Sequence, residues 1–340
     1  MQLSDRYFAR GREFLGTEVP ILCGGMTWIS NAQLVAAMAN AGGFGCLAGG
    51  NSPAAILEAE IQRTRELTDR PFAVNLVTIA PAFPEQLEVV CRQRPQYVVF
   101  AGSFPNAREV EQVKALGSKV ICFASTISIA QRMVRYGADA LVLEGMEAGG
   151  HVGHVSLTVL LQQVLFEMSE VPIFVAGGIA TGKMCAHLLL MGAAGVQLGT
   201  RFAVAKESCA HPRFKEKFCK ANARDAVSTP QFDSRLPVVA VRALRNAGLE
   251  DFSRLQLELI AQLDAGTIHR EAAQLEVEKF WMGALRRAVQ EGDIERGSLM
   301  AGQSVGLVDR EEAVADILAD LRQGIEAELQ AVRSRLLPEA

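Results

Sequence analysis

The stretch Pro172-Ile-Phe-Val-Ala-Gly-Gly-Ile179 and the later stretch Gly195-Val-Gln-Leu-Gly-Thr-Arg201 decide how this chain folds. Each begins with a short apolar run and passes into glycine. The runs are apolar on both faces of an expected strand instead of alternating with polar residues, and a parallel sheet covered on both sides requires this pattern. The two stretches therefore indicate buried parallel strands, each leading into a glycine loop.

The same pattern recurs from Val19 to Phe202, where apolar runs alternate with segments of helical periodicity. In Ile129–Tyr136, for example, the apolar residues fall on one face, as in an amphipathic helix. Eight runs predict a closed TIM (β/α)₈ barrel, with a doubly wound open sheet as the alternative. The predicted strands are Val19–Gly24, Phe44–Gly49, Phe72–Val77, Tyr97–Ala101, Lys119–Ala124, Ala140–Glu144, Pro172–Ala176 and Gly195–Gly199, and the clearest helices between them are Asn31–Asn40, Ala54–Leu67, Ile129–Tyr136 and Leu157–Glu167.

The alternation stops after Arg201. The segment Lys206–Arg287 is polar and helical in character, and it holds no further strand–helix alternation. A small-residue loop, Gly297–Gln303, then precedes an amphipathic closing helix from about Arg310 to Leu336. The expected units are a barrel at residues 1–205, a helical lid or substrate domain at 206–290, and a loop and closing helix that return to the barrel at 291–340.

Composition excludes several classes of protein. Among the 340 residues, 34 Lys and Arg stand against 38 Asp and Glu, and no basic run offers a surface for nucleic acid. No stretch approaches the roughly 18 apolar residues of a membrane span, and the first residues lack the apolar core of a secretion signal. The seven cysteines are scattered and show no Cys-x-x-Cys spacing, which favours free thiols in the cytoplasm over a disulfide or metal framework. We expect a cytoplasmic protein without bound metal.

Glycine-rich strand ends locate the expected site. In a barrel, the loops that follow the strands form the active site, and glycine lets backbone N–H groups approach a ligand closely. Any single Gly-Gly pair serves equally well as a tight turn. Two glycine loops at neighbouring positions, Gly177-Gly178 after the seventh strand and Gly199-Thr200 after the eighth, favour a phosphate site. A Rossmann dinucleotide site is not indicated, because no G-x-G-x-x-G follows a strand.

His151 is the predicted acid or base. It lies in the glycine-rich run Glu144–His154, which we expect to be a flexible loop at the barrel mouth. His154 lies three residues further on, and its role stays open. A metal site formed by these two histidines has weak support, since no arranged Cys or carboxylate completes it. Cys23 also lies at a strand end, where a thiol is usually a packing residue rather than a nucleophile.

These loops resemble the FMN-dependent enoyl-acyl-carrier-protein reductase II family, FabK, and the wider nitronate monooxygenase (2-nitropropane dioxygenase) group. The resemblance runs through nearly the whole chain. It is carried by Pro20–Trp28, Asn40–Gly45, Pro71–Asn75, Glu144–Gly153, Ala176–Ile179, Gly195–Phe202, Lys206–Ser208 through Lys215–Lys217, and Gly297–Gln303.

The resemblance implies that FMN binds at the strand ends and that His151 is the catalytic histidine. Gly178, Gly199 and Thr200 would then hold the FMN phosphate. In the FabK type, NADH or NADPH reduces the flavin, which delivers hydride to a trans-2-enoyl thioester of acyl carrier protein or CoA in fatty-acid synthesis. The implied cofactor residues are Gly24, Gly25, Met26, Asn75, Glu144, Gly149, Gly150, Ala176, Gly177, Gly178, Gln197, Gly199 and Thr200.

Two alternatives share this implied site: a nitronate monooxygenase, which needs no nicotinamide, and an NAD(P)H:quinone-type oxidoreductase. The runs Glu144–His151 and Gly297–Gln303 resemble FabK more closely. Two features depart from the FabK pattern. His154 is unexpected at its position, and Phe232–Asn246, which we expect to meet the acyl or nicotinamide ligand, matches only from Val241 onward. The resemblance also implies a homodimer.

Overall fold

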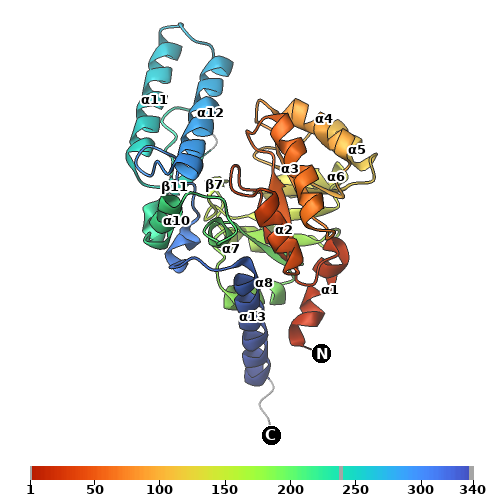
Figure 1. The fold of residues 1–340 in the computed structure, drawn as a ribbon. Helices are drawn as coiled ribbons and strands as arrows, with labels where there is room; N and C mark the ends of the chain where they lie inside the picture. The colour runs from red at the N-terminus through yellow and green to blue at the C-terminus, as the bar shows by residue number, and fades with distance from the viewer. Residues whose placement is uncertain (1, 237–239, 337–340) are drawn as a thin grey trace.

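The computed structural model describes residues 2–236 and 240–336. Eight parallel strands close into a barrel in the order β1-β2-β3-β4-β5-β6-β8-β9 (Figure 1). Leu22 of the first strand pairs with Gln197 of the last, which closes the barrel and excludes the open sheet. The predicted TIM barrel and its eight strands are confirmed. Their bounds are β1 Ile21–Cys23, β2 Phe44–Ala48, β3 Ala73–Val77, β4 Tyr97–Ala101, β5 Lys119–Ala124, β6 Ala140–Glu144, β8 Ile173–Ala176 and β9 Gly195–Leu198.

Helices connect these strands on the outside of the barrel, and side chains cap several of them. The side chains of Asn31, Thr126 and Thr181 each accept a hydrogen bond from a backbone N–H in the first turn of the following helix. Each of these caps fixes the residue at which the loop ends and the helix begins. The connecting helices are α2 Ala32–Asn40, α3 Ala54–Leu67, α4 Phe83–Gln93, α5 Ala107–Lys114, α6 Ile127–Arg135, α7 Leu157–Leu160 with the π-helical turn η1 Leu161–Leu165, α8 Gly182–Leu190 and α9 Thr200–Ala203.

The amino-terminal helix α1 (Leu3–Leu15) covers one end of the barrel. Tyr97 Oη and Lys119 Nζ both donate hydrogen bonds to the Phe14 carbonyl oxygen, each at 2.7 Å. The ring of Tyr97 packs edge-on against Phe44 in the barrel interior. Because α1 and these aromatic rings fill the end where the strands begin, a ligand has to enter at the opposite end, where the strands finish.

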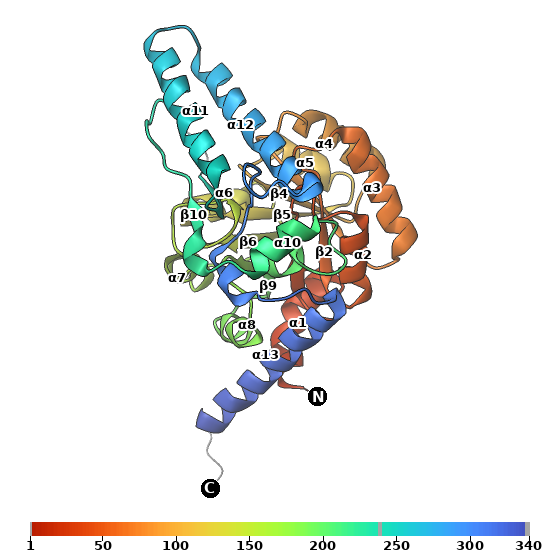
Figure 2. The same cartoon turned by 60° about the vertical axis from the view of Figure 1, so that its left-hand side comes forward.

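The carboxyl-terminal half adds a helical hairpin that extends away from the barrel (Figures 1 and 2). Its two helices enclose a small apolar cluster of their own that includes Phe252, Leu259 and Trp281. The elements after the barrel are α10 Pro212–Cys219, η2 Ala223–Asp225, β10 Ala226–Ser228, β11 Val241–Leu244, α11 Ala247–Asp264, α12 Arg270–Arg286, η3 Arg287–Glu291, η4 Gln303–Leu307 and α13 Val314–Leu336.

The segment expected to be helical, residues 206–290, also contains two short strands. Strands β10 and β11 form an antiparallel sheet with β7 (Gly150–His151), a two-residue strand in the loop after β6. These strands are only two to four residues long. Their pairing joins segments far apart in the sequence, so periodicity within a window does not reveal them.

The closing helix α13 packs along α8 and contacts α1. Gly182 and Gly324 let the two helix backbones approach each other. A Cβ on Gly182 would lie 2.5 Å from the Leu321 carbonyl oxygen and 2.7 Å from the Gly324 Cα. This contact fixes the end of the chain to the outside of the barrel.

The structure also bears on the cysteines and on membrane association. All seven cysteines are free; four are buried, while Cys91 and Cys219 are partly exposed and Cys209 is exposed. Within residues 2–236 and 240–336, no helix combines the length and apolar character of a membrane span.

Candidate active site

A cavity of about 390 Å³ opens at the ends of the barrel strands. Its size lies within the usual range of small-molecule sites, about 300–1,000 Å³. Loops after six strands contribute to it, together with residues near the carboxyl end of the chain. Every predicted site residue lines this cavity: Gly24, Gly25, Met26, Asn75, Glu144, Gly149, Gly150, His151, Ala176, Gly177, Gly178, Gln197, Gly199 and Thr200.

The loops after β6 and β8 lie against each other. Gly145 N donates a hydrogen bond of 3.0 Å to the Ala176 carbonyl oxygen. Gly177 adopts φ +100°, which side-chain-bearing residues rarely adopt, and a Cβ there would lie 2.9 Å from the Gly145 carbonyl oxygen. The Gly177-Gly178 turn therefore places backbone, not side chains, at this wall of the cavity.

His151 is held in the small sheet and does not lie in a flexible loop, so that expectation is corrected. It pairs with Val241 of β11, and Gly150 pairs with Arg242. Val152 N donates to the Ala240 carbonyl oxygen at 2.9 Å, which continues the link. The pairing fixes the backbone on both sides of the imidazole.

Arg242 anchors this sheet to the loop after β6. Its side chain is buried, Nε donates to the Met146 carbonyl oxygen at 2.9 Å, and Nη1 donates to the Ala226 carbonyl oxygen at 2.7 Å. One side chain thus connects the loop that precedes His151 to β10.

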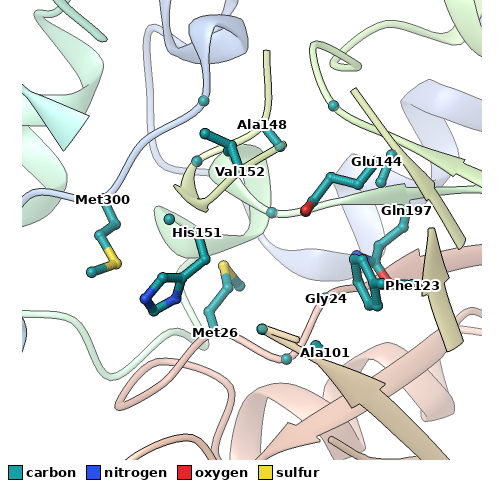
Figure 3. A pocket seen from close by; sticks show the side chains of 18 of the residues that line it. Gly24, Met26, Ala101, Phe123, Glu144, Ala148, His151, Val152, Gln197 and Met300 are labelled. Carbon is teal, nitrogen blue, oxygen red and sulfur yellow. The ribbon is translucent and has the colours of Figure 1, made fainter. Parts of the chain in front are cut away.

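The imidazole of His151 faces the cavity (Figure 3). Burial lowers the His151 pKa to about 4, because the charged form loses its hydration. Its Nε2 atom is buried without a hydrogen-bond partner in the described structure. At neutral pH the ring is therefore neutral, and Nε2 is free to bind a ligand.

Glu144 lies on the other side of the cavity from His151, near Gln197 and Phe123 (Figure 3). Desolvation raises the Glu144 pKa to about 8. No hydrogen bond joins its carboxyl group to another described residue. The carboxyl group is therefore mostly protonated at pH 7, and the cavity holds two titratable groups that are both uncharged.

The family model described as nitronate monooxygenase matches residues 10–86 and 77–324, which include all of the cavity residues. The chain belongs to the nitronate monooxygenase family.

The proteins that are similar to this chain carry several names. The chain is 32% identical to a (3aS,4S,5R,7aS)-5-hydroxy-7a-methyl-1-oxo-octahydro-1H-indene-4-carboxyl-CoA dehydrogenase of Mycobacterium tuberculosis, over 87% of this chain and 90% of the relative. It is 27% identical to a nitronate monooxygenase of Paraburkholderia phytofirmans, over 92% and 94%. A solved structure of FabK from Thermotoga maritima superimposes with a TM-score of 0.85 at 35% identity and covers 96% of this chain and 98% of that one.

Part of the cavity comes from residues that the sequence did not single out. Phe104, Phe123 and Ser125 follow β4 or belong to the end of β5, where no glycine pair marks a site. Leu285, Met300 and Ser304 complete the wall from the carboxyl-terminal half. The small-residue run at 297–303 was the only sequence signal for that wall.

Other expectations fare differently. Among the described residues of Phe232–Asn246 none lines the cavity, whereas 237–239 lie outside the described residues. His154 is exposed and absent from the lining. Burial raises the pKa of the Cys23 thiol to about 12, so Cys23 stays protonated and is a packing residue. In the described parts of the chain, no group of three or more His, Cys, Asp or Glu is placed to hold a metal ion.

Proposed function

We propose that this protein is an FMN-dependent oxidoreductase that acts on acyl thioesters and reduces trans-2-enoyl thioesters with electrons from NADH or NADPH. The acyl carrier would be CoA or acyl carrier protein. The observation that carries this proposal is a cavity without formal charge, in which one imidazole nitrogen is left unpaired.

The residues present suit FMN. A Cβ on Gly199 would have only the Met26 sulfur, at 3.6 Å, within 4 Å, so this backbone leaves room for a ligand group. Backbone N–H groups of Gly178, Gly199 and Thr200 would hold the phosphate, and Asn75 and Gln197 offer amides to a ring system. When bound, FMN supplies a centre that accepts a hydride from a donor and passes it to an acceptor.

The uncharged cavity favours a thioester over a nitronate. No lysine or arginine is among the described residues that line it, Glu144 is largely protonated at pH 7, and His151 is neutral. Away from the backbone N–H groups that would hold the FMN phosphate, burying an anion without a cation costs much more than burying a neutral ester. A thioester enters this cavity without that cost.

His151 would orient and polarise the thioester. In the tautomer that holds its proton at Nε2, the ring donates a hydrogen bond to the thioester carbonyl oxygen. This bond draws electron density from the β-carbon and strengthens as negative charge develops on the oxygen. Met26 and Met300 line the same cavity as the imidazole and would give an acyl chain an apolar surface.

The comparisons support the thioester class. The Mycobacterium tuberculosis relative is named as a dehydrogenase of a carboxyl-CoA compound, so its named substrate is a CoA thioester. Its reaction and the proposed one both change the oxidation state of an acyl thioester.

A nitronate is the second candidate substrate. The family model and several relatives carry the name nitronate monooxygenase. With this substrate, the unprotonated nitrogen of His151 would act beside the nitronate carbon, and no nicotinamide would be needed.

The test is anaerobic stopped-flow spectroscopy of purified protein with FMN bound. NADH or NADPH is mixed first, and crotonyl-CoA, a nitronate or a quinone second. We expect fast reduction by a nicotinamide and fast reoxidation by crotonyl-CoA. Slow reduction by both nicotinamides with fast reduction by the nitronate overturns the proposal in favour of the monooxygenase, and reoxidation only by the quinone identifies the quinone-type enzyme.

His151→Ala extends the test to the mechanism. We expect FMN to stay bound while turnover of crotonyl-CoA falls by about 10²–10⁴, the usual contribution of a positioned acid or base. Flavin absorbance and steady-state rates measure the two effects. An unchanged rate removes His151 from the mechanism, and loss of flavin assigns it a structural role.

A further inference from the structure

One sector of the cavity rim contains no carboxylate. The loop residues 101–108, the segment 125–136 and the segment 150–158 include no Asp or Glu, although the chain carries a net charge of −4. All three reach the same cavity, through Phe104, Ser125 and Gly153. A Cβ on Gly153 would lie 2.7 Å from the Ser125 Cβ, so two of these segments are in direct contact. The sector therefore lacks the groups that would repel an anion.

Arg132 of α6 is an unpaired cation in this sector. Its guanidinium carbon lies 5.1 Å from the centre of the Phe104 ring. Its Nε is buried with no hydrogen-bond partner, and no ion pair or hydrogen bond links its guanidinium group to another described residue. A buried donor without a partner is uncommon in folded proteins and indicates a missing acceptor.

Phe104 is an exposed aromatic ring at the same place. It is 37% exposed, which is unusual for a phenylalanine, and it lines the cavity. One aromatic ring beside one arginine suits a ligand that has both a flat ring and an anion, since the first stacks on the phenyl ring and the second pairs with the guanidinium fork.

We propose that Phe104 and Arg132 form a binding site for the adenine nucleotide portion of a substrate, with a phosphate group on Arg132 and the purine against Phe104. The proposal rests on the proposed function, because it names where the part of the substrate away from the reacting atoms binds, at the rim of the catalytic cavity. Two substrates of that reaction have this chemistry, a CoA thioester and the nicotinamide dinucleotide.

The test measures equilibrium binding by calorimetry to the FMN-loaded protein, with CoA and NADP⁺ as the probes. We compare wild type, Arg132→Gln, Phe104→Leu and Arg135→Gln. Arg135 is the matched control, because it is exposed on the same helix and its loss changes the charge equally. For at least one probe, we expect Kd to rise about tenfold in Arg132→Gln, severalfold in Phe104→Leu, and less than twofold in Arg135→Gln.

The two probes identify the source of the nucleotide. Weaker binding of CoA alone assigns the site to the acyl thioester, and weaker binding of NADP⁺ alone assigns it to the dinucleotide. Equal affinities in wild type and Arg132→Gln for both probes overturn the proposal, as does an equal effect in Arg135→Gln, which would reflect net charge only. Circular dichroism and flavin content confirm that each variant is folded.

A kinetic measurement separates this inference from the proposed function. Crotonyl-CoA and the crotonyl thioester of N-acetylcysteamine share the reacting atoms, but the second has no phosphate. If the site holds CoA, the KM of crotonyl-CoA divided by the KM of the N-acetylcysteamine thioester is about tenfold higher in Arg132→Gln than in wild type. If Arg132→Gln turns over both thioesters with the same KM ratio and the same nucleotide affinities as wild type, the binding site is rejected and the reductase activity stands. If wild type binds the nucleotides and Arg132→Gln binds them more weakly, but neither thioester is turned over, the binding site stands and the reductase activity is rejected.

Discussion

At the scale of single residues, burial alone sets the protonation of the two titratable side chains on opposite sides of the cavity. It shifts the pKa of Glu144 upward and that of His151 downward, so each side chain is predominantly uncharged at neutral pH. The effects on stability run in opposite directions. Between pH 4.5 and 8, the free energy of unfolding falls as the pH rises, because Glu144 ionises more readily in the unfolded chain. Between pH 6.5 and 4, it falls as the pH drops, because His151 takes up a proton more readily in the unfolded chain.

Between pH 6.5 and 8 the comparison of wild type with Glu144→Gln isolates Glu144, because both proteins carry the same histidines and the folded His151 is neutral throughout. We expect wild type without cofactor to lose up to ~2 kcal/mol of unfolding free energy over this interval relative to Glu144→Gln, since one proton corresponds to about 1.4 kcal/mol per pH unit. Urea unfolding at pH 6.5 and 8.0 measures the difference. Parallel pH profiles in the two proteins would show that Glu144 ionises normally.

At the scale of elements, the sheet of β7, β10 and β11 fixes the backbone of His151 through the pairing of β7 with β11. We expect Arg242→Met to lower the free energy of unfolding by about 1–3 kcal/mol, because it leaves the buried Ala226 carbonyl oxygen and the partly buried Met146 carbonyl oxygen without their donor. Turnover should fall as well, since the backbone of β7 loses its anchor. Thermal unfolding and steady-state rates test this, and Arg245→Met, an exposed arginine one residue beyond β11, is the control. Equal losses in the two variants would contradict the anchoring role.

The sequence predicted some elements and missed others for identifiable reasons. Strands such as Tyr97–Ala101 are continuous apolar runs with both faces buried, so the sequence pattern and the strand coincide. Glycines such as Gly177 mark the site because a turn needs their backbone freedom. In contrast, β7, β10 and β11 form only by pairing with one another across the chain. Phe104 and Met300 reach the cavity through folding of the whole chain, and no local pattern distinguishes them from core residues.

At the scale of the whole molecule, α13 ties the end of the chain to the barrel through the contact at Gly182 and Gly324. We expect Gly182→Ala to destabilise the protein by about 1–3 kcal/mol, because its Cβ would collide with the backbone of α13. Glycine to alanine elsewhere in a helix usually stabilises.

Gly283→Ala in α12 is the control for this prediction, since its Cβ would meet only the Arg287 Nη1 atom at 3.4 Å. Differential scanning calorimetry compares the two variants. A Tm for Gly182→Ala at or above that of wild type would mean that the two helices separate without cost.

The hydrogen bond from Gly302 N to Thr200 Oγ1 joins residues 102 positions apart. The complete cavity therefore forms only after both of these segments have been synthesised. The last barrel strand ends at Leu198, whereas Met300, Gly302 and Ser304 belong to the far wall. At about 5–20 residues per second, a ribosome needs roughly 5–20 s to add the intervening chain. Throughout that interval, a nascent barrel has its strands but lacks one side of its cavity. Capture of a ligand that needs the complete cavity is therefore a late event in the synthesis of each molecule.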